Sequence, residues 1–134
     1  MKLLGAKGVR EVSARGMEVA SHTMSHVKLA SLEPELLEKE VSDSRQVLSN
    51  LLGEPVEGFS YPYGSIDSAA IWAARRVHYS YACIDSVRIE KSAYDLPRIY
   101  VAEGDNLMRL AAKFMIYSQH QRIARRLRRR SRKT

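Results

Sequence analysis

The chain has 134 residues, of which 45% are hydrophobic and 28% are charged, and its formal net charge is +7. This length allows one domain with a core of its own and is short for two, and the composition is typical of a globular protein. No apolar run reaches the roughly eighteen residues of a membrane-spanning helix, so we expect no transmembrane segment in this sequence. The only cysteine, Cys83, excludes an internal disulfide.

The positive charge is concentrated at the C-terminal end. Residues Arg122–Lys133 contain seven arginines and one lysine but no acidic residue, so the rest of the chain is close to neutral. This pattern divides the chain into a domain over residues 1–118 and a basic tail over residues 119–134. A basic helix there would make weak, salt-dependent contacts with anionic lipid or nucleic acid. The alternative is a solvated, frayed terminus, which the absence of interleaved aromatic residues favours.

The first residues, MKLLGAKGVREV, hold only a very short apolar stretch before charge returns. A secretory signal needs a longer apolar segment, of about 7–15 residues. The sequence leaves the localisation open, and as written, with no secretory signal, it is compatible with a cytoplasmic protein.

The first part of the chain predicts a short helix and then a strand. Val9–Arg15 favours a helix closed by Gly16, because glycine tolerates the left-handed conformation at a helix end. Met17–Ala20 is a short apolar run of the kind that forms a buried strand.

The next helix has the clearest pattern. Ser31 is placed to cap it, Pro34 falls in its first turn, where the missing N–H is harmless, and Gly53 ends it. An apolar face and a mostly charged face run along it. The apolar face is formed by Leu37, Val41, Leu48, Leu51 and Leu52, and the charged side by Glu33, Glu35, Glu38, Lys39, Glu40, Asp43 and Arg45.

A strand, a turn and a helix follow. We expect the strand over Val56–Ser60 and a rigid turn at Tyr61–Gly64, where proline and glycine lie close together. The helix is expected over Ala69–Val77, with Asp67 or Ser68 as its cap.

The last part of the chain predicts two strands and a helix. The strands are expected over Tyr79–Ile84 and Leu96–Val101, and Pro97 places the second at a sheet edge or a strand start. The final helix begins at Asp105 and turns an apolar side inward, formed by Leu107, Leu110, Ala111, Phe114 and Met115. The whole order predicts an α/β sheet with helical crossovers.

Two histidines follow the Met17–Ala20 run, at the end of a strand where α/β sheets usually carry their ligand sites. His22 and His26 are four residues apart, so a helical turn would place both imidazoles on one face, within reach of one metal ion. Zinc sites use at least three protein ligands, so the pair is an incomplete set. The alternative is that either histidine is a hydrogen-bonded core or surface residue.

Two motifs, GMEVASHTMSH and FSYPYG, give the chain a resemblance to a known family. The first contains His22-Thr-Met-Ser-His26 and resembles the His-Ser/Thr-x-x-His metal pair of the polysaccharide deacetylases, the NodB-homology carbohydrate esterases. The second contains Tyr61-Pro62-Tyr63-Gly64 and resembles that family's third motif. The likeness extends over roughly Val9–Val101 and includes the helix between the motifs.

The resemblance implies a partial or distorted (β/α) barrel and a divalent metal, Zn²⁺ or another, held by His22 and His26. It implies removal of N-acetyl groups from an N-acetylated polysaccharide substrate, with the backbone N–H of Tyr63 stabilising the oxyanion. Tyr61 and Tyr63 would stack on a sugar face, and their alternative role is packing in the turn. Members of the family are often secreted or found in the cell envelope.

The chain departs from the family pattern in two places. The family's first motif, Thr-Phe-Asp-Asp-Gly, supplies a third metal ligand and the general base, but no aspartate precedes His22, and the acids there are Glu11 and Glu18. Leu96-Pro97-Arg98 replaces the Leu-x-His motif that supplies the general acid. The chain thus resembles the C-terminal portion of such a domain, and we expect its hydrolysis to be impaired.

Two functions are therefore open. One is a metal-dependent deacetylase that is complete only with a missing N-terminal portion. The other is a non-catalytic α/β module with a basic tail, which binds carbohydrate or a partner through Tyr61, Tyr63 and Trp72. Zinc binding and acetate release distinguish them.

Overall fold

The computed structural model of the chain describes residues 4–85 and 92–131, with side chains described through residue 119 and at Arg122. From α2 onward its elements confirm the predicted order of helices and strands. In order they are α1 (Ala6–Ala14), α2 (Pro34–Leu52), β1 (Gly58–Ser60), the 3-10 turn η1 (Pro62–Gly64), α3 (Ser68–Arg76), β2 (Tyr81–Ile84), β3 (Leu96–Pro97) and α4 (Leu107–Ser131).

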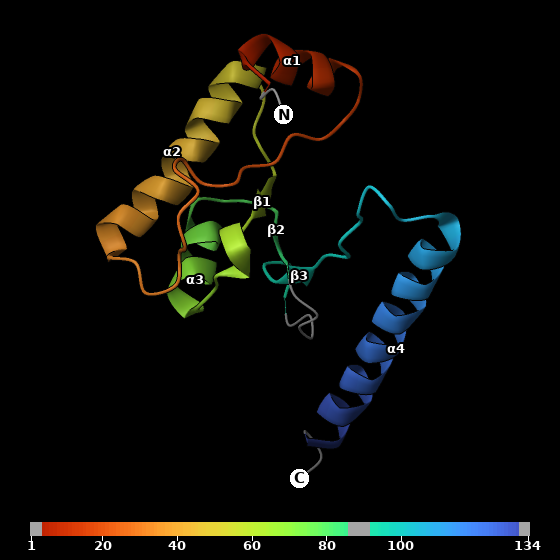
Figure 1. Ribbon diagram of the computed structural model, residues 1–134. Helices are drawn as coiled ribbons and strands as arrows, with labels where there is room; N and C mark the ends of the chain where they lie inside the picture. Colours follow the sequence, from red (N-terminus) through yellow and green to blue (C-terminus); the bar gives the residue numbers. More distant parts are fainter. Residues whose placement is uncertain (1–3, 86–91, 132–134) are drawn as a thin grey trace.

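The three strands form one parallel sheet in the order β1–β2–β3 (Figure 1). Ser60 pairs with Cys83 and Cys83 with Leu96, so the carboxyl ends of the strands lie at one edge. Ser21 joins the other side of β1 through a single parallel bridge to Phe59. Helix α3 joins the parallel strands β1 and β2, which follow each other in chain order as in a (β/α) barrel, and this sheet forms part of one.

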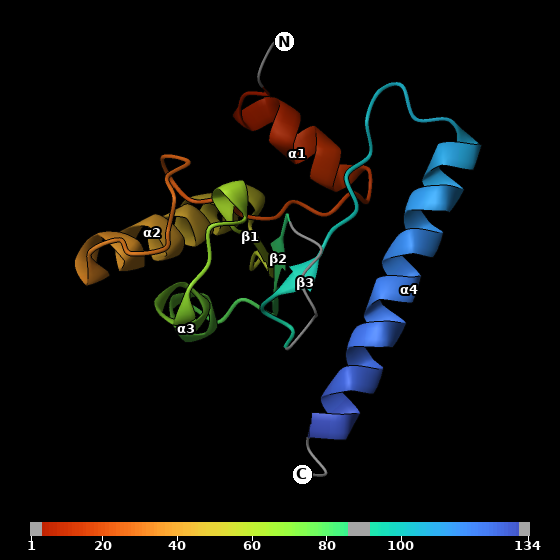
Figure 2. The same ribbon diagram turned by 60° about the horizontal axis from the view of Figure 1, so that its bottom comes forward.

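Helices α2 and α3 cover one face of the sheet, and the core lies between these two layers (Figures 1 and 2). The ring of Phe59 is at its centre, 5.1 Å from the ring centroid of Tyr61 and 5.0 Å from that of Tyr79. The hydroxyl of Tyr79 donates to the Val41 carbonyl of α2 at 3.1 Å, which satisfies a buried polar atom. The core consists of Leu29, Leu37, Val41, Val56, Phe59, Tyr61, Ala70, Ala73, Ala74, Tyr79, Ala82 and Ile84.

Helix α2 confirms the predicted amphipathic pattern. Leu37 and Val41 are buried, and Leu48 and Leu52 pack against the core. Gly53 follows the helix with φ 76°, in the left-handed conformation that glycine adopts without strain. The bounds of this helix could therefore be predicted from its local chemistry.

The two predicted helix caps have different outcomes. Ser31 does not cap α2, which begins at Pro34 without a side-chain cap, and that prediction is wrong. Asp67 caps α3 as predicted, by accepting a hydrogen bond from the Ala70 N–H at 2.8 Å. Its other carboxylate oxygen accepts from the Ser31 N–H at 2.9 Å. These two N–H groups hold the pKa of Asp67 below its usual value.

The predicted strand over Met17–Ala20 is wrong. Met17 is 54% exposed, none of residues 17–20 is in a strand, and the segment joins the sheet only at Ser21. A strand needs a ladder of backbone partners. An apolar run cannot show whether a neighbouring strand is present to supply them.

The C-terminal elements differ most from expectation. β3 is confined to two residues, Leu96–Pro97, at the sheet edge that its proline predicted. Helix α4 lies on the β3 side of the sheet, apart from α2 and α3 (Figure 2). Its predicted inward side is wrong, because Leu107, Phe114 and Met115 are 83%, 63% and 58% exposed.

Helix α4 continues through the predicted boundary at residues 118 and 119 as far as Ser131. Residues 132–134 and most side chains of the basic tail lie outside the described residues, so its predicted contact with lipid or nucleic acid stays a prediction. Among the described helices, none combines the length and the hydropathy needed to cross a bilayer.

Candidate functional site

His22 directly follows Ser21 and contacts the carboxyl end of β1. Its Nδ1 lies 2.6 Å from the carbonyl oxygen of Ser60. Because a carbonyl oxygen can only accept a hydrogen bond, Nδ1 carries the proton and donates it. In the neutral ring the lone pair is then on Nε2, which is the nitrogen that remains for a metal bond.

His26 lies beside His22, with the two ring centroids 4.9 Å apart. Its Nδ1 is 3.1 Å from the Tyr63 hydroxyl of η1, and the rings of His26 and Tyr63 meet edge to face at 4.8 Å. The predicted proximity of the two histidines is therefore confirmed. A helical turn does not produce it, because Thr23 and His26 have φ values of 67° and 57° and the segment is a loop.

A buried carboxylate from α2 holds this loop. Glu40 is 6% exposed and accepts hydrogen bonds from the N–H groups of Met24 at 2.9 Å and Ser25 at 3.0 Å. Its assignment to the charged face of the helix is wrong. The spacing carried a usable signal, since Glu40 lies three residues after Leu37 and four before Ser44, and both of these are buried.

Tyr61 lies in the core. Its side chain is 0% exposed, and its hydroxyl donates to the Tyr94 carbonyl at 3.0 Å. Burial, and then the nearby Asp95 carboxylate, raise the pKa of Tyr61 above its ordinary value. The expectation that this ring stacks on a sugar is wrong, and the alternative role, packing in the turn, is the one in the structure.

Tyr63 faces solvent from η1, with a side chain that is 65% exposed and a φ of 57°. The next residue, Gly64, has φ 60° and abuts the end of β2, so that an added Cβ would lie 3.1 Å from the Asp85 carbonyl oxygen. This close approach holds the turn against the same sheet edge as the histidines. The role of the Tyr63 N–H as oxyanion donor stays a prediction.

The donors present fit part of a divalent-metal site. Zinc sites use imidazole ligands, and two imidazoles are adjacent here. Zinc sites also commonly hold such a ring by a hydrogen bond from its other nitrogen, as the Ser60 carbonyl does for Nδ1 of His22. Across the described residues, no group of three or more His, Cys, Asp or Glu side chains could hold a metal ion. Glu18 accepts a hydrogen bond from Tyr81, and Glu11 pairs with Lys7 on α1. The pair therefore needs a further ligand.

Two other residues from the sequence analysis line separate cavities. Arg98, at the position expected for the family's general acid, lines a cavity of about 420 Å³ with Asp85 and Tyr100. Trp72 is 59% exposed and lines a cleft of about 220 Å³ between α2 and α3, with the Arg76 guanidinium 5.0 Å from its ring centroid. In the described part of the chain, no hydrogen bond or ring contact joins either residue to the histidine pair.

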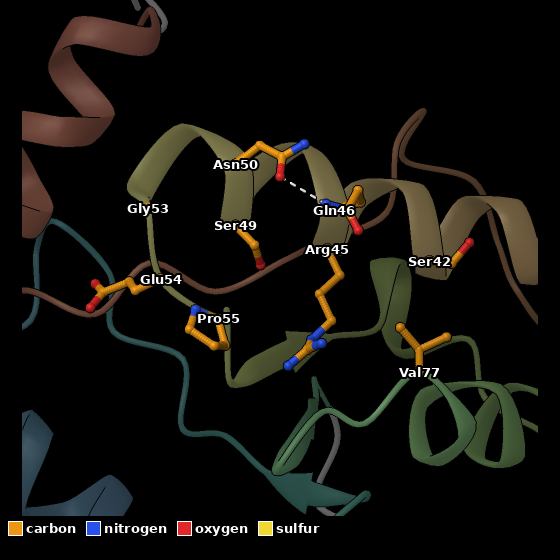
Figure 3. Close-up of a pocket in the computed structure, with 9 residues that line it drawn as sticks. All are labelled: Ser42, Arg45, Gln46, Ser49, Asn50, Gly53, Glu54, Pro55 and Val77. Carbon is orange, nitrogen blue, oxygen red and sulfur yellow. Dashed lines mark hydrogen bonds between the residues drawn. The ribbon is translucent and has the colours of Figure 1, made fainter.

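An open cavity of about 810 Å³ lies near the C-terminal end of α2 (Figure 3). The Arg45 side chain extends from α2 toward the segment before β1, and its Nε donates to the Val56 carbonyl at 2.9 Å. Val56 precedes β1, whereas the histidine pair contacts the carboxyl end of that strand. This cavity therefore lies at the opposite edge of the sheet and is not part of the candidate site.

The sequence is similar to known polysaccharide deacetylases. The model of the family described as Polysaccharide deacetylase matches residues 5–82, which is more than half of the chain. YxkH of Bacillus subtilis (strain 168), a protein assigned to the polysaccharide deacetylases, is 25% identical over 99 residues, which cover 72% of this chain and 36% of YxkH.

Solved structures share the fold. The deacetylase PplD of Streptococcus pyogenes has a TM-score of 0.73 and 22% identity, over 82% of this chain and 50% of that one. BC0361, a polysaccharide deacetylase from Bacillus cereus, has a TM-score of 0.71 and 20% identity, over 82% of this chain and 36% of that one. The predicted NodB-type α/β fold is thus confirmed, and the chain spans half or less of these relatives. From the family match, the chain belongs to the polysaccharide deacetylase family.

Proposed function

We propose that this chain carries the histidine part of a divalent-metal site, for Zn²⁺ in the first place, in a hydrolase that removes N-acetyl groups from a sugar polymer. The observation that carries the proposal is the adjacent pair His22 and His26 at the carboxyl edge of the sheet. Membership of the family supports it. The Streptococcus pyogenes relative was solved in complex with acetate, the product that such a reaction releases.

Each residue of the candidate site has a proposed role in binding the metal or the substrate. Ser60 fixes the His22 ring with Nε2 available, and Tyr63 contacts His26. When bound, a divalent metal would supply polarisation of the amide carbonyl and activation of water. The Tyr63 N–H is proposed to donate to the oxyanion that develops, and its exposed ring to receive a sugar face.

The described residues do not complete this machinery. They supply two imidazoles, and no third ligand joins them. We propose that the remaining ligand and the general base come from a missing N-terminal segment. General acid–base catalysis is worth about 10²–10⁴-fold for each group, so without these groups the turnover of this chain is expected to be very low.

Zinc binding tests the proposal directly. The purified chain should bind about one Zn²⁺, more weakly than a three-ligand site would because it supplies only the imidazole pair. His22→Ala and His26→Ala should each abolish that binding, because each removes half of the pair. His78→Asn is the matched control. His78 follows α3 at φ 63°, a conformation that asparagine tolerates, and it precedes β2 at the opposite edge of the sheet. Zinc binding by the wild type that is no tighter than that of the alanine variants would overturn the proposal.

The missing third ligand favours a second candidate, a non-catalytic carbohydrate-binding module. Acetate release from an acetylated chito-oligosaccharide separates the two. Slow release that depends on added Zn²⁺ and on His22 supports the deacetylase. Binding of the oligosaccharide without release, unchanged by His22→Ala, supports the module.

A further inference from the structure

The buried carboxylate of Glu40 has no place in the proposed chemistry. Glu40 is on the core face of α2, which it shares with Leu37, Val41 and Ser44, and it is 6% exposed. An ionised carboxylate in such a place is unfavourable unless its oxygens are hydrogen-bonded. Among the described residues, the ion pairs formed do not include Glu40. Its position is therefore explained by its hydrogen bonds alone.

All of these hydrogen bonds come from the segment between the two histidines. The N–H groups of Met24 and Ser25 both donate to Oε2 of Glu40, at 2.9 and 3.0 Å, and the Ser25 hydroxyl donates to Oε1. Burial raises the pKa of Glu40, but the hydrogen bonds from Ser25, Met24 and Thr23 outweigh it and leave that pKa below its usual value. The carboxylate thus binds the backbone of the loop as an anion.

The loop needs such a partner because its conformation is unfavourable in isolation. Thr23 and His26 both have positive φ, 67° and 57°, which side chains with a Cβ rarely adopt. The hydroxyl of Thr23 accepts from the His26 N–H at 3.0 Å, so the loop is closed by one bond of its own. Glu40 then holds its two central amides from the side of the helix.

We propose that Glu40 is a positioning residue for the histidine pair. Its carboxylate holds the Thr23–Ser25 loop in the conformation that keeps the rings of His22 and His26 4.9 Å apart, ready for one metal ion. This inference rests on the proposed metal site. Glu40 would then raise the metal affinity of the site, although its side chain does not touch the metal.

The test is Glu40→Gln in the full chain. Glutamine has the same shape, but only one of its two terminal atoms can accept a hydrogen bond, and the anion is lost. Removing a supporting contact of this kind typically weakens metal binding about 10–100-fold. Zinc affinity should fall by that factor. The matched control is Glu38→Gln, an exposed glutamate on the same helix, which should leave zinc affinity unchanged.

A second measurement separates this inference from the metal proposal. In the metal-free wild type, the Met24 and Ser25 amides should exchange slowly with solvent, and the protons of the two histidine rings should show a nuclear Overhauser contact. Both signs should be lost in Glu40→Gln, whether or not zinc binds. The Tyr61 amide, which donates to Cys83 within the sheet, should stay protected and shows that the fold is intact.

The possible outcomes are distinct. Failure of the wild type to bind zinc, with loop protection that depends on Glu40, overturns the metal site alone. Retained protection and ring contact in Glu40→Gln, or zinc affinity equal to wild type, overturns the role of Glu40. Ser25→Ala serves if Glu40→Gln does not fold, because it removes only the hydroxyl bond to Oε1. It should weaken zinc binding less than Glu40→Gln, and unchanged binding contradicts the inference.

Discussion

The hydroxyl of Tyr61 donates a hydrogen bond to the carbonyl oxygen of Tyr94, 3.0 Å away, from a side chain that is wholly buried. We expect Tyr61→Phe to lower the free energy of unfolding by about 1 kcal/mol, because it removes this bond and leaves the carbonyl without that donor. Urea unfolding followed by circular dichroism measures the change. Tyr63→Phe is the control: its exposed ring should change stability by less than about 0.5 kcal/mol. Equal effects of the two substitutions would contradict the different burial of the two rings.

Gly64 and Gly53 form a matched pair for testing how closely the Tyr61–Gly64 turn packs against the end of β2. Both have positive φ, 60° and 76°, but a Cβ on Gly64 would lie 3.1 Å from the Asp85 carbonyl oxygen, whereas a Cβ on Gly53 would meet nothing within 4 Å. Alanine at either position is expected to cost about 1–2 kcal/mol for the left-handed backbone. Gly64→Ala should cost more than Gly53→Ala, because the turn must also move away from β2. Equal losses in urea unfolding would show that the contact with Asp85 carries no strain.

Asp67 gives the stability a dependence on acid pH. Its folded-state pKa is depressed, first by the Ala70 N–H and then by the Ser31 N–H. The stability it contributes is therefore fully present above the unfolded value of about 3.9 and is lost as the pH falls through the lower folded-state pKa. Asp67→Asn keeps a capping oxygen but carries no charge.

The wild type should accordingly be more stable than Asp67→Asn at neutral pH, and the difference should shrink as the pH falls below about 4. Asp67→Ala should cost about 1 kcal/mol at neutral pH because the cap of α3 is lost. Urea unfolding at a series of pH values measures both. A constant gap between wild type and Asp67→Asn from neutral to acid pH would rule out the charged cap.

The parts of the fold that the sequence predicted correctly depend on local chemistry. Helix α2 is bounded by Pro34 and Gly53, and its apolar spacing shows which side is buried. The cap at Asp67 is also a local signal. The strand over Met17–Ala20 failed for the opposite reason, since a strand forms only where a neighbour offers backbone partners. Here that neighbour meets Ser21 alone.

In the candidate site, residue types were easier to predict than their surroundings. The spacing of His22 and His26 indicated a pair but not the loop that unites them. The burial of Tyr61 could have been predicted from the sequence, because it lies two residues after Phe59 and so on the same face of an extended chain. The loop that Glu40 binds could not have been predicted, because nothing local to α2 indicates a contact with a loop fifteen residues earlier.

The long sequence separation between the histidines and their contact partners also determines when the site can assemble. His22 meets Ser60 across 38 residues of sequence, and His26 meets Tyr63 across 37. Contacts this distant form only after α2 has folded back and β1 has docked, since long loops must close before such contacts form. During synthesis the histidines therefore emerge long before their partners, and we expect the paired imidazoles to be among the last features of this half of the chain to take shape. Zinc uptake in a refolding experiment would then report completion of the fold and not its onset.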